Sequence, residues 1–113
     1  MSVQLPDFIG TAAFDWDDGN WPKCGAHGLS REEIEHVFRS EPAVLADPAH
    51  SIEEQRLRAI GHGIGGRYVF VVFTMRELNG AVRIRPISAR YMHAKEIEKY
   101  ERQRQEASRS SDG

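Results

Sequence analysis

The longest apolar run of the chain, YVFVVF at positions 68–73, lies in the second half of the sequence. Apolar residues at both even and odd positions predict a central strand that is covered on both faces of its sheet. Asn79-Gly80 follows this run and is the strongest short hairpin signal in the chain. The pattern therefore predicts a tight turn there and an antiparallel strand that returns along the central one.

The returning strand is predicted over residues 81–88, with Val82 and Ile84 facing the core. Pro86 interrupts this strand, and a proline has no N–H group to donate to a neighbouring strand. We therefore expect the strand to lie at an edge of the sheet or to bulge at Pro86.

Weaker patterns place the remaining elements. Short strands are expected at 43–46 and 55–61, and the glycine-rich stretch 61–66 is expected to be a hairpin turn. That stretch lacks the following helix that a phosphate-binding loop needs. Helices are predicted over residues 30–40 and 93–105 from their apolar spacing.

The first helix has the clearer start signal. Ser30 and Glu33 have the spacing of a capping box, in which each side chain satisfies an exposed amide of the first turn. A further short strand is predicted at 12–17. The resulting element order predicts an α+β domain, with an antiparallel sheet on which the helices pack.

Length and composition predict one domain. The chain of 113 residues divides into a lead-in at 1–11, a domain at 12–106 and a polar, disordered tail at 107–113. No apolar run is long enough to span a membrane, and the first ten residues do not resemble a secretory signal. Cys24 is the only cysteine, which favours a reducing, cytoplasmic compartment.

Charge is distributed unevenly along the sequence. Residues 1–55 hold three basic and eleven acidic side chains, whereas residues 56–113 hold twelve basic and six acidic ones. The basic half could attract phosphates. The two halves could equally attract each other within one fold.

The segment 83–91, RIRPISARY, concentrates this positive charge at the end of the predicted returning strand. Alternation turns Arg83 and Arg85 to one face of the strand, and Arg90 lies just past its end. Each guanidinium presents a planar fork of donors that matches phosphate geometry, and Ser88 adds a hydroxyl. Such a strand end suits an RNA backbone, and it also suits an acidic protein partner.

Several motifs occur together in a specific order: FDWD at 14–17, HGLS at 27–30, EEQR at 53–56, FTMR at 73–76 and ISAR at 87–90. With them, the chain resembles the BrnT family, the toxin halves of type II toxin–antitoxin pairs, over roughly residues 12–102. The resemblance implies a RelE-like fold with a curved antiparallel sheet. It also implies a metal-independent ribonuclease that blocks translation and a BrnA-type antitoxin, through which alone the toxin would meet DNA.

RNA cleavage of this kind needs a base for the 2′-hydroxyl, an acid for the leaving oxygen, and cations for the charge on the phosphate. Leaning on the resemblance, we predict that Arg76 and Arg90 bind the scissile phosphate, because the two strand ends that carry them can converge. The alternative is that these arginines pair with the carboxylates of Glu96 or Glu98.

His27 and Glu54 are the acid and base candidates. His27 precedes a glycine and a helix start, and the pKa of a histidine lies near neutrality. Glu54 shares a strand face with Arg56, which could hold the carboxylate ionised. Alternatively, His27 fixes its loop to Asp15 or Asp17, and Glu54 forms an ordinary ion pair with Arg56.

Supporting RNA contacts are assigned to five further residues: Arg56, Arg83, Arg85, Ser88 and Tyr91. Tyr100 is expected to pack on the core. The five histidines have no paired spacing, so neither a metal nor another cofactor is predicted. Ala26 stands where the family commonly has a lysine, which motivates a second hypothesis: a binding module that is a scaffold or co-repressor without catalysis.

Overall fold

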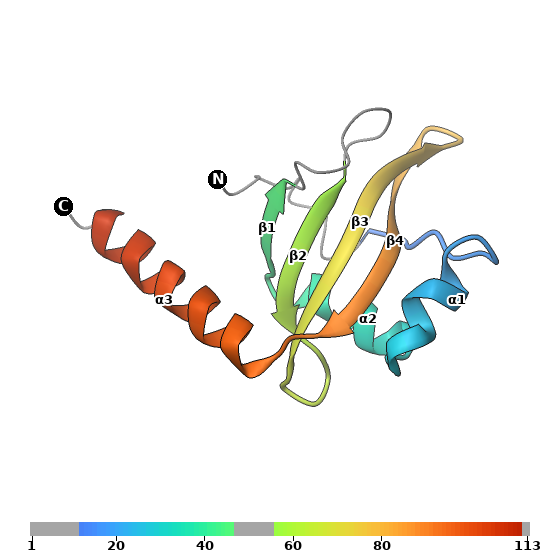
Figure 1. The fold of residues 1–113 in the computed structure, drawn as a ribbon. Helices are drawn as coiled ribbons and strands as arrows, with labels where there is room; N and C mark the ends of the chain where they lie inside the picture. Colours follow the sequence, from blue (N-terminus) through green and yellow to red (C-terminus); the bar gives the residue numbers. More distant parts are fainter. Residues whose placement is uncertain (1–11, 47–55, 112–113) are drawn as a thin grey trace.

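The computed structural model describes residues 12–46 and 56–111, which form an α+β domain with a four-stranded antiparallel sheet (Figure 1). The predicted α+β class with an antiparallel sheet is therefore confirmed. The elements in chain order are α1 (Trp21–Cys24), the 3-10 helix η2 (Gly25–His27), α2 (Arg31–Arg39), β1 (Ala43–Ala46), β2 (Leu57–His62), β3 (Tyr68–Leu78), β4 (Ala81–Tyr91) and α3 (Ala94–Ser111).

The strands follow one another in the order β1-β2-β3-β4, so β3 is an inner strand and β4 an edge, as predicted. The hairpin between them turns at Asn79-Gly80, where both residues have positive φ, 54° and 81°. Glycine adopts such angles without steric cost, and asparagine tolerates them better than most residues. The glycine-rich stretch after His62 likewise joins β2 to β3 as a hairpin.

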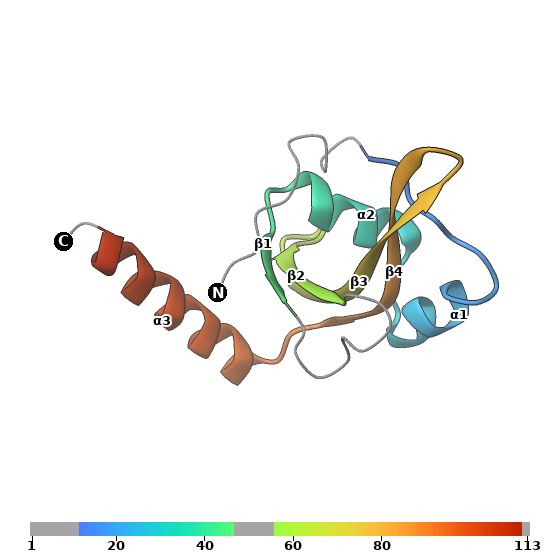
Figure 2. The ribbon, with the colours of Figure 1, turned by 90° about the horizontal axis from the view of Figure 1, so that it is seen from above.

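One face of the sheet, the core face, packs on α2. Val69, Val71 and Phe73 of β3 are fully buried there, and the ring of Phe38 meets that of Phe73 edge-to-face at 4.9 Å. Figure 2 shows the sheet curving around α2, while α3 extends away from it. On the opposite face, the open face, Tyr68, Phe70 and Val72 are half-buried and Thr74 is buried, so the apolar run at 68–73 is fully covered on the core face only.

The start of α2 is capped, but by half of the predicted capping box. The Ser30 hydroxyl accepts the N–H of Glu33 at 3.1 Å. The Glu33 carboxylate instead accepts the N–H of Ile64 and the hydroxyl of Tyr91, each at 3.1 Å. Glu33 therefore ties α2 to the β2–β3 turn and to β4, because tertiary donors take its oxygens.

The last helix, α3, differs from its prediction in length and in packing. It continues to Ser111, so the polar stretch from Ala107 is helical up to that residue. It projects from the sheet in both views (Figures 1 and 2). Its contacts with the sheet include Tyr100, whose ring lies 5.7 Å from that of Tyr68. Among the described residues, no helix is long and apolar enough to cross a membrane.

The predicted strand at 12–17 is reduced to a single parallel bridge between Phe14 and Ile84 of β4. The N–H of Asp15 reaches the Ile84 carbonyl at 2.8 Å, and the Ile84 N–H reaches the carbonyl of Ala13 at 3.0 Å. This segment therefore covers part of the outer edge of β4, an edge that would otherwise offer unpaired backbone groups.

Strand β4 confirms both predictions for Pro86, because the strand is an edge and its pairing with β3 shifts at this residue. Phe73 pairs with Pro86 and Val72 with Ser88, which leaves one extra residue between them. Ile84 is fully buried, as predicted. Val82 is 39% exposed, so its predicted place in the core is wrong.

Candidate functional site

Several arginine side chains lie on the open face of the sheet. Leu57, Ile84 and Ala89 are buried on the core face, and alternation turns their strand neighbours the other way. The side chains that share the open face on this pattern include those of Arg58, Arg76, Arg83, Arg85 and Arg90. The basic second half of the sequence thus places its arginines on the open face. The core face is covered by α2, whose first turn is acidic.

Three of these arginines gather with two carboxylates near the β3–β4 turn, which we call the hairpin-end cluster. Arg76 contacts Asp15 at 3.2 Å, and Arg85 contacts Asp15 at 3.0 Å and Asp17 at 3.0 and 3.1 Å. Arg83 lies opposite Arg76 in register. The bond from Arg85, followed by a backbone N–H, lowers the pKa of Asp17. These contacts tie the segment before α1 to the sheet.

Asn20 fixes the same segment from a buried position, with 3% of its surface exposed. Its amide nitrogen donates to the carbonyls of Asp15 at 2.9 Å and Pro86 at 2.8 Å, and its oxygen accepts the N–H of Asp17 at 2.8 Å. The carbonyl of Pro86 at the sheet edge is therefore satisfied within the chain.

Arg90 lies at the other end of the open face, where α3 begins. Its guanidinium forms a bidentate pair with Glu96, both contacts at 2.8 Å, and stands 4.9 Å from the ring centre of Phe70. The Glu96 carboxylate also accepts the N–H of His93 at 2.9 Å. The bond from Arg90, then that from His93, lowers the pKa of Glu96 to about 2. The alternative of pairing with Glu96 is thus what the structure shows for Arg90.

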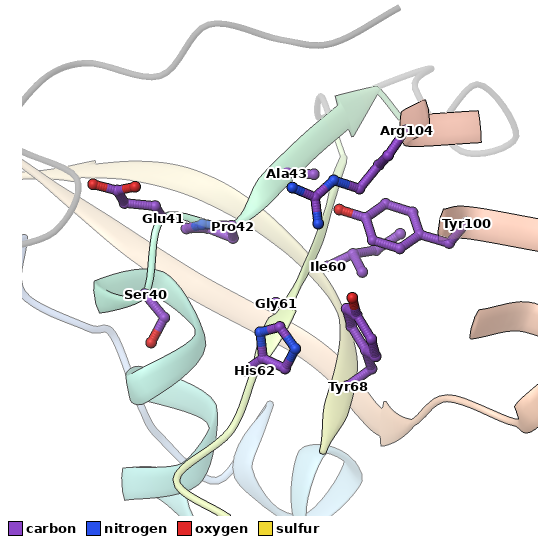
Figure 3. Close-up of a pocket in the computed structure, with 10 residues that line it drawn as sticks. All are labelled: Ser40, Glu41, Pro42, Ala43, Ile60, Gly61, His62, Tyr68, Tyr100 and Arg104. Atoms are coloured by element: carbon purple, nitrogen blue, oxygen red, sulfur yellow. The ribbon is translucent and has the colours of Figure 1, made fainter. Parts of the chain in front are cut away.

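A pocket of about 230 Å³ lies beside this end of the sheet, against α3 (Figure 3). We call it the aromatic pocket. His62 and Tyr68 are opposite in register and their rings are 4.3 Å apart; the Tyr100 ring meets Tyr68 edge-to-face, and Arg104 lies 5.7 Å from the centre of the Tyr100 ring. The full lining consists of Ser40, Glu41, Pro42, Ala43, Ile60, Gly61, His62, Tyr68, Tyr100 and Arg104.

Arg76 and Arg90 do not converge as predicted. Arg90 pairs with Phe70, six positions along β3 from Arg76, which corresponds to roughly 20 Å. The prediction failed because two antiparallel strands run in opposite directions, so their carboxyl ends lie at opposite ends of the hairpin. Arg90 is instead close to the aromatic pocket, since Phe70 is two residues from Tyr68.

Of the two predicted acid and base candidates, only His27 lies within the described residues. His27 is exposed at the end of η2, which contacts β4. Asp15 and Asp17, the predicted alternative partners of His27, are bonded to arginines. Glu54 lies outside the described residues, and Arg56 is half-buried just before β2. The roles of His27 and Glu54 remain predictions.

Ser88 and Tyr91 lie on different sides of β4. Ser88 pairs with Val72 and shares the open face with the arginines. Tyr91 packs against the core, donates its hydroxyl to Glu33 at 3.1 Å and has Arg67 3.7 Å from its ring centre. Burial, together with the bond to Glu33, raises the pKa of Tyr91. Tyr91 is therefore a link between elements, and its ring lies on the core side of β4, whereas the Arg90 side chain lies on the open face.

Sequence reasoning missed the aromatic pocket and placed Tyr100 in the core. A signal for the pocket existed, because His62 and Tyr68 flank the predicted β2–β3 turn at positions that pair across such a hairpin. Tyr100 and Arg104 are four residues apart on a helix and so share a face. The sequence did not show the direction of α3. This helix projects from the sheet, yet its face with Tyr100 and Arg104 lies beside the ends of β2 and β3 at His62 and Tyr68.

The fold and the open face define a small α+β protein with an arginine-rich surface, of the kind that binds phosphate backbones. Residues 16–96 match the family model of the ribonuclease toxin, BrnT, of type II toxin–antitoxin systems, and the chain belongs to this family. The resemblance drawn from the motifs is thereby confirmed. A toxin of this type has an antitoxin partner. No curated protein matches the chain.

Proposed function

We propose that this protein is the RNA-cleaving toxin of a type II pair, acts in the cytoplasm without a metal ion, and cuts RNA on its open face. The observation that carries this proposal is the position of Arg90 on the open face, at the same end of the sheet as the aromatic pocket: it pairs with Phe70, two residues along β3 from Tyr68 of the pocket lining. A cation and aromatic rings side by side suit a strand with phosphates and unstacked bases. The curved antiparallel sheet is also compatible with the RelE-like architecture that the resemblance implies.

In the proposed reaction, a base takes the proton of a ribose 2′-hydroxyl, and the oxygen attacks the adjacent phosphorus. The bond from phosphorus to the 5′-oxygen then breaks, and an acid gives that oxygen a proton. The products are a 2′,3′-cyclic phosphate and a 5′-hydroxyl. Arg90 stabilises the extra negative charge on the phosphate through N–H groups other than the two that bond Glu96, and Glu96 holds the guanidinium in orientation.

His27 and Glu54 are the proposed acid and base, and each such proton transfer contributes roughly 10²- to 10⁴-fold. The support for His27 is that η2 lies against β4, the strand that carries Ser88 and Arg90. Ser88 is proposed to contact the backbone next to the scissile phosphate. Arg56, Arg83 and Arg85 are proposed as more distant contributors to the positive potential.

The proposed antitoxin is of the BrnA type and carries the DNA-binding segment, so the toxin meets DNA only through it. We propose that it covers the open face. The edge of β4 near Pro86 is less suited to the antitoxin, because Asn20 already binds the Pro86 carbonyl and the segment around Phe14 lies along the strand.

The test incubates the purified chain with single-stranded RNA at low salt in EDTA. We expect fragments that end in a 2′,3′-cyclic phosphate. The matched substrate carries a 2′-deoxy sugar at the mapped cleavage position, which removes the attacking oxygen, and it should stay intact there. Uncut RNA with folded protein, or cleavage that needs an added divalent metal, would contradict the proposal.

A further inference from the structure

The aromatic pocket joins rings from three elements at a place where they contribute little to the core. His62 of β2 is exposed, whereas Tyr68 of β3 and Tyr100 of α3 are half-buried. Aromatic side chains usually bury their large apolar area, so three rings around an open pocket suit a flat apolar ligand. We propose that the aromatic pocket binds one unpaired nucleobase of the RNA and that Arg104 binds a neighbouring phosphate, an inference that rests on the proposed function.

The rings are held in place by contacts with two helices. The Tyr68 hydroxyl donates to Glu101 of α3 at 3.2 Å. The carbonyl of His62 lies 3.0 Å from Nδ1 of His36 on α2. This contact fixes the end of β2, which carries the His62 ring. A site that is already ordered loses less entropy when it binds a ligand. The pocket is therefore prepared for stacking without a rearrangement of its walls.

Size and charge narrow the ligand class. The volume of about 230 Å³ is below the roughly 300 Å³ at which pockets for drug-sized ligands begin, so one ring system fits better than a whole nucleotide. The Arg104 guanidinium is directed toward the rings in Figure 3, whereas the Glu41 carboxylate points away from them. A second acidic group near the rings, Glu101, is bonded to the Tyr68 hydroxyl.

The position beside Arg90 connects this pocket with the proposed cleavage site. Tyr68 and Phe70 are two residues apart on the open face, about 7 Å, and Arg90 stands over the Phe70 ring. A base in the pocket would therefore belong to a nucleotide close to the phosphate at Arg90. Stacking accepts every base, so we expect the pocket to select for single-stranded RNA more than for sequence.

The experiment measures binding of fluorescently labelled 2′-O-methyl RNA hexamers, which lack the attacking hydroxyl, by fluorescence anisotropy. Tyr100→Ala is expected to raise the Kd roughly 5- to 150-fold, the range for loss of one stacked base. Tyr100→Phe keeps the ring and should change the Kd less than about twofold. Circular dichroism of both variants checks that α3 is retained.

Arg104→Ala tests the phosphate contact through salt dependence. The slope of log K against log salt should fall in magnitude by roughly 0.7, the value for one phosphate contact on a single strand. Arg102→Ala is the matched control, because Arg102 lies on the same helix but lines a different groove, with Lys95 and Lys99. The control should leave the slope unchanged.

The outcomes separate this inference from the proposed function. If the wild-type chain cuts RNA but Tyr100→Ala binds the hexamers as tightly as wild type, the pocket inference fails and the nuclease proposal stands. If binding depends on Tyr100 but RNA stays uncut, the nuclease proposal fails and the base-binding pocket stands. If Tyr100→Ala binds RNA normally but no longer co-purifies with the antitoxin, the pocket serves the protein partner and the inference is overturned.

Discussion

The two ends of the open face carry the same side chain in different surroundings. At the hairpin end, Arg76 and Arg85 are bonded to Asp15 and Asp17, about 60 to 70 positions away in the sequence. At the α3 end, Arg90 is bonded to a carboxylate only six positions away and pairs across the hairpin with Phe70, two residues from Tyr68 of the aromatic pocket. The first arrangement closes the fold around its amino-terminal segment. The second fixes the start of α3, at the same end of the sheet as the aromatic pocket.

This difference shows why a row of arginines does not by itself define a binding site. A guanidinium that already bridges two carboxylates must exchange those bonds before it can hold a phosphate. Arg85 is in this position, and its side chain is only 17% exposed, whereas Arg90 is bonded to one carboxylate and its side chain is 35% exposed. The arginine count of the open face therefore overstates its capacity for RNA, and the neighbouring groups decide which arginine is available.

The largest expected effect is on catalysis at the α3 end. Arg90→Ala should lower the rate of RNA cleavage about 10²- to 10³-fold, the usual cost of losing one group that stabilises transition-state charge. Arg76→Ala is the matched change at the hairpin end, where the side chain is also partly exposed, and should lower the rate less than about threefold. Single-turnover cleavage of a labelled RNA measures both.

Equal losses for Arg90→Ala and Arg76→Ala would remove the distinction between the two ends. Arg90→Lys sharpens the test further, because it keeps the charge but loses the bidentate fork. We expect this variant to fall between wild type and Arg90→Ala.

The second prediction concerns stability at the hairpin end. Asn20→Ala should lower the free energy of unfolding by about 1–3 kcal/mol, because it leaves buried backbone groups of Asp15, Asp17 and Pro86 without their partner. Asp18→Ala, an exposed neighbour, should change it by less than about 0.5 kcal/mol. Urea unfolding followed by tryptophan fluorescence gives both values. A neutral Asn20→Ala would mean that water replaces these bonds and that the cluster does not hold the segment.

The smallest prediction is a pH dependence at the α3 end. The folded pKa of Glu96 is about 2, below its ordinary value of 4.5, so its pairing stabilises the fold above about pH 4.5 and is lost as the pH falls toward 2. Glu96→Gln should therefore reduce the loss of stability between pH 7 and pH 3. The effect should be about 1 kcal/mol or less, because both partners are about a third exposed and screened by solvent.

Thermal unfolding at the two pH values measures this effect. Glu98→Gln, an exposed change on the same helix, is the control and should follow the wild-type profile. If Glu96→Gln and wild type lose the same stability in acid, the pair with Arg90 does not contribute to the fold.

The features that the sequence predicted correctly depend on short-range chemistry. The Ser30 cap, the Asn79-Gly80 turn and the edge position of β4 at Pro86 each follow from the conformational or hydrogen-bonding limits of the residue itself. The motifs that revealed the family are also local strings. Each of these signals could be recognised without knowledge of the tertiary structure.

The features that the sequence did not predict depend on contacts between distant segments. Nothing local shows that Asp15 meets Arg85, or that the oxygens of Glu33 would be taken by Ile64 and Tyr91. The position of α3 was missed because a sparse apolar seam predicts a helix face but not what that face contacts. The aromatic pocket follows from that position, and so it was missed as well.

The extra residue in β4 has a consequence for how this protein can change in evolution. Arg85 and Arg90 are five positions apart, so in an unbroken strand they would point in opposite directions. Ile87 is the extra, unpaired residue and shifts the alternation by one position. As a result the Arg90 side chain lies on the open face and Ala89 on the core face. Deletion of one codon here would bury a guanidinium and expose a methyl group, whereas no substitution elsewhere in the strand could reverse the exchange. The length of this segment therefore decides which side chains of β4 face the core more strictly than the identity of most of its residues does.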